Sequence, residues 1–115
     1  MTTAKRPVNL GKQGKKVWDA LTRMAELEEW ELVTLLEACR VADRLDALAL
    51  AQTDQPLTVR NYKGDTVASP FLVESRQQAV TYTRLVASLR IPDVETGKQQ
   101  QHRGASRAPY VLRSA

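Results

Sequence analysis

The segment 28–52 constrains the fold most, because it contains neither proline nor glycine. It predicts a helix that spans about 35 Å at about 1.5 Å per residue. A helix that packs on one surface needs a single apolar stripe, and this segment has two on nearly opposite sides. We therefore expect two partners: the chain's own core, and either another part of the chain or a neighbouring subunit. In so short a chain we favour a neighbour. One stripe holds Leu32, Leu35, Leu36 and Cys39, and the other, the predicted subunit interface, holds Val41, Leu45 and Leu48.

Two further helices are predicted, one on each side of this segment. Over 11–26, Val17, Leu21 and Met24 recur at helical spacing on one side. After Ser69-Pro70, which favours a helix start with serine as the N-cap and proline at the first position, a third helix is expected to run to about residue 90. Pro92 stops it.

Residues 57–68 differ in character from the helical segments. Strand-forming residues occur on both sides of Lys63-Gly64-Asp65, which supplies turn chemistry. This pattern predicts a short β-hairpin. An isolated hairpin is marginally stable, so we expect it to dock on the helices or on another subunit.

The two ends of the chain lack a helical or strand pattern. Residues 1–10 are expected to form a flexible basic arm. Residues 92–115 hold a glutamine run and scattered arginines but little to bury, which predicts a disordered basic tail. Its one apolar spot is a candidate docking motif for a partner, and it consists of Tyr110, Val111 and Leu112.

The whole chain of 115 residues suits a single domain. The expected fold is mainly α, with a three-helix core over residues 11–91 and the hairpin between the second and third helices. No apolar run approaches the roughly 20 residues that cross a bilayer, so we expect no membrane partner.

Charge is distributed unevenly along the sequence. Residues 1–16 carry five basic residues and no acid, and residues 97–115 carry four and no acid. The stretch between them holds eight basic and thirteen acidic residues. Basic ends of this kind favour a polyanion, with DNA first, although charged ends also serve solubility. The candidate phosphate contacts are Lys5, Arg6, Lys12, Lys15, Lys16 and Arg23.

Three of these lysines crowd the start of the first predicted helix, where positive charge opposes the helix dipole. Together with free backbone N–H groups at that end, they would suit a phosphate. The segment 11–16 is not an ATP-binding phosphate loop, because Asn9 stands where the motif needs glycine and Lys16 where it needs serine or threonine.

No catalytic or metal-binding pattern appears in the sequence, so we expect neither an enzyme nor a cofactor. The only cysteine, Cys39, is expected to be a small buried helix residue. The only histidine, His102, falls in the predicted tail, where nothing fixes its geometry for nucleophilic catalysis.

The order of several short motifs resembles the P27-type family of phage terminase small subunits. The shared pieces include Gly14-Lys15 with Trp18, Glu29-Trp30-Glu31, Ala42-Asp43-Arg44, Lys63-Gly64 and Leu89-Arg90-Ile91-Pro92-Asp93. The resemblance implies a non-catalytic ring of identical chains in the host cytoplasm. Such a ring engages viral double-stranded DNA and brings the large terminase subunit, a motor and nuclease, to it.

Two other functions remain open from the sequence. One is a small helical adaptor that binds a protein and never touches DNA. The other is a DNA-binding regulator, which would need a recognition helix with exposed polar residues at its start. The third helix offers Arg76, Gln77 and Gln78 for that role.

Overall fold

The computed structural model describes residues 4–89 and 91, and within them the chain is mainly helical. The predictions that fall on residues 1–3 and on 92–115, including Tyr110, Val111 and Leu112, lie outside the described residues. The elements follow in the order α1 (Lys12–Met24), α2 (Glu29–Gln52), β1 (Thr58–Arg60), β2 (Thr66–Ala68) and α3 (Pro70–Ser88). The predicted fold class of three helices with a hairpin is thus confirmed.

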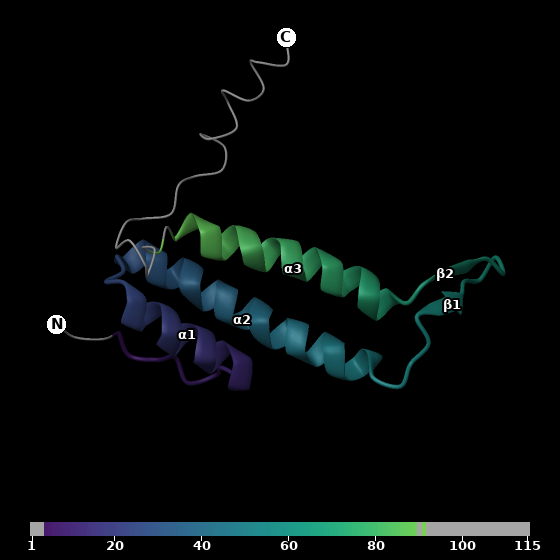
Figure 1. The fold of residues 1–115 in the computed structure, drawn as a ribbon, viewed down its shortest axis with the longest axis horizontal. Coiled ribbons are helices and arrows are strands. Elements are labelled where there is room, and N and C mark those ends of the chain that lie inside the picture. The colour runs from purple at the N-terminus through teal and green to yellow at the C-terminus, as the bar shows by residue number, and fades with distance from the viewer. Residues whose placement is uncertain (1–3, 90, 92–115) are drawn as a thin grey trace, which may run out of the picture.

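The central helix is α2, and the other two helices run antiparallel to it on different sides (Figure 1). α3 accompanies α2 over most of its length, whereas α1 covers only the first half of α2. The core lies where all three helices meet. Its buried members come from α1, from α2 and from the residues just before α1 and just after α3, and they are Leu10, Trp18, Leu35, Cys39, Leu89 and Ile91.

Local signals place the helix starts. At α2 the side chain of Glu28 caps the Glu31 amide, while the Glu31 carboxylate accepts from the Glu28 amide at 2.8 Å. At α3 the Ser69 hydroxyl accepts from the Phe71 amide at 3.3 Å, and Pro70 occupies the first helical position. The second cap is the helix start that Ser69-Pro70 predicts.

The end of α2 is tied to the start of α3 through Gln52. Its side-chain nitrogen donates to the carbonyls of Gln55 and Pro56, both at 3.0 Å. Its side-chain oxygen accepts from the buried Ser69 hydroxyl at 2.6 Å. This network turns the chain out of α2 and fixes where α3 begins.

The hairpin extends beyond the helices at the end where α2 stops and α3 begins (Figure 1). β1 and β2 pair antiparallel, with Val59 opposite Val67. Gly64 has a φ of 86°, which the turn requires and which glycine adopts without strain. The residues of β2 are all exposed, so the hairpin does not dock on its own helices in this chain.

The position of α1 depends on a single carboxylate of α2. Asp43 accepts hydrogen bonds from the amides of Gly11 at 2.7 Å and Gly14 at 2.8 Å. A Cβ at Gly14 would stand 2.5 Å from Asp43 Oδ2 and 2.9 Å from the carbonyl oxygen of Cys39. Only glycine therefore allows α1 to approach this close to the α2 backbone.

Replacing Asp43 tests this arrangement. Asp43→Ala leaves the two amides without an acceptor, so we expect the free energy of unfolding to fall by about 1–3 kcal/mol. Asp43→Asn keeps an acceptor oxygen and should lose less. Urea denaturation followed by circular dichroism measures both. Asp46→Asn is the matched control, because it removes the same charge from an exposed position of the same helix. A loss for Asp46→Asn as large as that for Asp43→Ala would show that charge, and not capping, is responsible.

Candidate nucleic-acid interface

The candidate cations of α1 lie on its solvent side. Lys12, Lys15, Lys16 and Arg23 are exposed, while Trp18 on the opposite side is only 4% exposed. Helical periodicity causes this separation. The apolar residues recur at the spacing that faces α2, and the basic residues occupy the positions that face solvent. None of the four forms an ion pair with any residue that the structure describes. They are thus available to an external anion.

The backbone amides at the N-terminus of α1 are partly occupied by the chain itself. Two of its amides, those of Gly11 and Gly14, donate to Asp43. The anion that we expected at this helix end is therefore a carboxylate of the chain itself, which offsets the positive end of the helix dipole. Two of the backbone amides that this prediction would offer to a phosphate therefore already have an acceptor. The lysine side chains remain.

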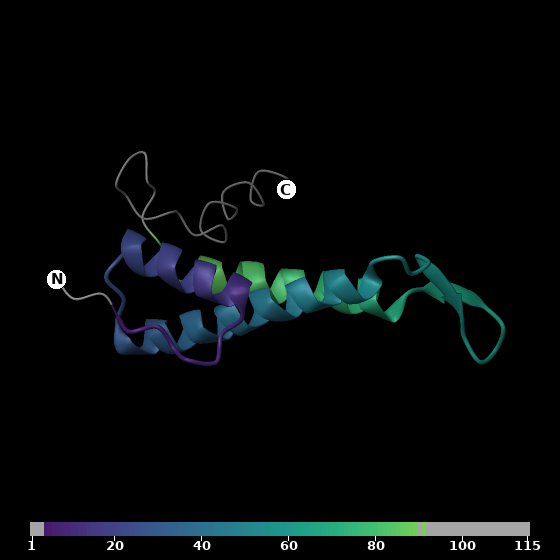
Figure 2. The same cartoon turned by 90° about the horizontal axis from the view of Figure 1, so that it is seen from below.

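Residues 4–10, for which the sequence predicts a flexible arm, lie against the helices (Figure 2). Leu10 is buried in the core, and Ala4 packs against it. The Trp18 indole donates to the Ala4 carbonyl at 3.4 Å. The segment lies here because Trp18 offers it an apolar surface to pack on and an indole N–H that donates to its backbone.

The two cations of this segment differ in their surroundings. Arg6 forms an ion pair with Asp19 at 2.8 Å, and both side chains are roughly half exposed, at 44% and 43%. Lys5 is exposed and has no ion pair among the described residues. Of the six candidate cations, Arg6 is therefore the one whose charge is already balanced by the chain.

The second stripe of α2 faces α3 of the same chain. Gln52, which bonds to Ser69 at the start of α3, lies at helical spacing from Val41, Leu45 and Leu48 and so on the same side. Val41 is 1% exposed within the single chain, and the other two are half-buried. Assigning this stripe to a neighbouring subunit is therefore wrong for Val41. The two opposed stripes arise because α1 and α3 both pack on α2.

Cys39 is buried, as expected, and it is a poor nucleophile. Burial raises the pKa of its thiol to about 12, and the nearby Asp43 carboxylate adds to the effect. No cluster of side chains that could hold a metal ion occurs in the described part of the chain. Within the same residues, no helix is both long and apolar enough to cross a membrane.

The raised pKa makes Cys39 a test of the core. In the native protein at pH 8 we expect negligible reaction with a disulfide reagent such as dithionitrobenzoate, and full reaction in urea, because the thiolate is the reactive form. The native pKa lies above the ordinary value of 9.0. Below pH 9 the thiol is neutral in both the folded and the unfolded chain. Above it the unfolded thiol ionises while the buried one does not, so the free energy of unfolding falls as the pH rises. Cys39→Ala should remove that loss. Fast labelling of the folded chain would contradict the buried position.

Comparison with models of known families, with curated proteins and with solved structures finds no match to this chain.

Proposed function

We propose that the chain is a packaging protein of the small-terminase kind, which assembles with copies of itself, engages viral double-stranded DNA and brings the large terminase subunit to it. The observation that carries the DNA part is the exposed cluster of Lys12, Lys15 and Lys16 on one side of α1. Lysines of this kind bind phosphates by charge, without reading the base sequence. Repetition of the cluster in each subunit would strengthen binding through valency.

Assembly is supported by what the single chain leaves uncovered. α1 covers the first half of α2 only, so the second half of α2 and the first half of α3 form a two-helix layer (Figure 2). Leu50 in this region is 76% exposed, and Leu57 at the base of the hairpin is 67% exposed. Two helices alone cannot bury all their apolar side chains, and a bare hairpin is marginal. Neighbouring copies would cover both.

The adaptor alternative shares the uncovered surfaces but gives no role to the lysines. The regulator alternative is less well supported, because a helix-turn-helix joins two crossed helices by a turn of three or four residues. Here α2 and α3 run antiparallel and are joined by a hairpin. In addition, Gln78 is half-buried and donates to Glu74 at 2.8 Å, so it does not project for base contacts.

DNA binding tests the lysine cluster. Changing Lys12, Lys15 and Lys16 together to glutamate should weaken binding to duplexes of unrelated sequence to a similar degree. The logarithm of affinity falls against the logarithm of salt by about 0.9 for each phosphate neutralised, so the slope should become shallower by about 2 to 3 per chain. Fluorescence anisotropy with labelled duplexes over a range of salt concentrations measures this slope.

Two comparisons sharpen the experiment. Arg6→Gln should change the slope less than Lys12→Gln, because Arg6 already faces Asp19. Lys63→Glu, at the exposed turn of the hairpin, controls for a general change in net charge. Unchanged affinity of the triple variant at moderate salt would exclude this cluster and leave the adaptor function as the better explanation.

A further inference from the structure

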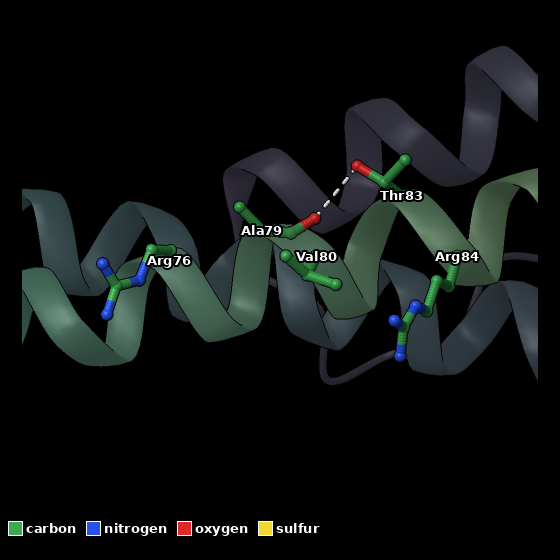
Figure 3. A pocket seen from close by; sticks show the side chains of 5 residues that line it. All are labelled: Arg76, Ala79, Val80, Thr83 and Arg84. Atoms are coloured by element: carbon green, nitrogen blue, oxygen red, sulfur yellow. Dashed lines mark hydrogen bonds between the residues drawn. The ribbon is translucent and has the colours of Figure 1, made fainter.

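A strip on α3 combines an apolar centre with two cationic ends. Arg76, Val80 and Arg84 follow at intervals of four residues and therefore share one side of the helix. With Ala79 and Thr83 they line a shallow depression of about 400 Å³ (Figure 3). Val80 is 46% exposed, and neither arginine forms an ion pair among the described residues.

The polar atom nearest the centre of this strip is already satisfied. The Thr83 hydroxyl donates to the Ala79 carbonyl at 3.0 Å, as the dashed line in Figure 3 marks. The centre therefore presents carbon to a partner, while charge is confined to the ends. At about 1.5 Å per residue the two arginine positions lie about 12 Å apart along the helix.

A strip on α2 has the same spacing with the opposite charge. Glu29, Val33 and Glu37 also follow at intervals of four residues. Val33 is 67% exposed, and Trp30 beside it is 59% exposed. Glu37 contacts Arg40 at 3.4 Å and Arg44 at 3.5 Å, with all three side chains substantially exposed. Such pairs contribute little to stability, so Glu37 can exchange Arg40 or Arg44 for another cation at small cost.

We propose that the α3 strip of one copy packs on the α2 strip of the next copy, with Val80 against Val33 and the two arginines opposite the two glutamates. This rests on the homo-oligomer in the proposed function and names the surfaces that form it. The matching spacing lets both charge pairs and the apolar centre engage at once. Trp30 would supply the large aromatic contact that such interfaces favour.

A second copy suits the α3 strip better than the other candidates do. DNA would use the two arginines but would leave the apolar centre without a partner. The C-terminal tail carries arginines and no acid between residues 97 and 115, so its charge repels Arg76 and Arg84. The α2 strip supplies both the acid and the apolar surface.

The contact joins two different surfaces, and we place it head-to-tail because a ring requires that arrangement. Each copy uses its α3 strip toward one neighbour and its α2 strip toward the other. Repeated in this way, the contact gives a closed ring or an open filament, whereas a two-fold dimer would use both strips of each copy toward the same neighbour.

Charge reversal tests the pairing. Arg76→Glu with Arg84→Glu should convert the oligomer to monomer, and so should Glu29→Lys with Glu37→Lys, as measured by light scattering after size exclusion. Mixing the two variants should restore the oligomer, because each altered strip meets its complement in the other variant. Thr81→Glu places an acid on an exposed position of α3 outside the strip and should leave the oligomer intact. Circular dichroism checks that every variant is folded.

Trp30 gives an independent measurement. Trp18 is buried in the single chain and Trp30 is exposed, so acrylamide quenching in a Trp18→Phe background reports on Trp30. Quenching should fall as the protein concentration rises through the association range.

Each outcome decides between the two proposals. A wild type that is monomeric at every concentration overturns both the oligomer and this contact. A wild-type oligomer that both charge variants retain overturns the contact and leaves the oligomer. Loss of DNA binding by the arginine variant with its oligomer intact would make the α3 strip a DNA contact and would also overturn the pairing. Restoration only on mixing supports the pairing.

Discussion

The carboxylate of Asp43 holds two backbone amides of α1, and the position of the first helix depends on this contact. Gly11 and Gly14 bring the amides within 2.7 and 2.8 Å of it. The close approach seats Trp18 in the core, and Trp18 in turn holds the segment that precedes the helix. With its apolar side on α2, the helix turns its lysines to solvent. The surface that we assign to DNA is thus a consequence of a contact on the other side of the same helix.

Most of the secondary structure was predictable, because each element carries its own local signal. The Ser69-Pro70 pair, the glutamates around the start of α2 and the glycine of the turn act over a few residues, and the structure uses each of them. Helical periodicity also separated the basic and apolar sides of α1. The exposure of Lys12, Lys15 and Lys16 followed from spacing alone.

Contacts between distant segments were not predictable in the same way. Asp43 lies 29 residues from Gly14, and no periodicity links an acid on one helix to glycines on another. The two stripes of α2 are evident, but the sequence does not say which segment covers each. It leaves open α3 or a neighbouring subunit for the second stripe, and for Val41 the cover lies within the chain. The contact of residues 4–10 with the core has no sequence signal, because its anchor is a backbone carbonyl, that of Ala4, which any residue would offer.

The buried core draws on both ends of the described chain, and this has a consequence for folding. α1 and α2 are close in sequence, so they can pair early at a small entropic cost. Leu10 nevertheless shares its core with Leu89 and Ile91, which are synthesised last among the described residues. Until they arrive, the apolar sides of the first two helices have no complete cover. A nascent or truncated chain that stops before the end of α3 would therefore expose apolar surface. It would be prone to aggregate, even though two of its three helices had already formed.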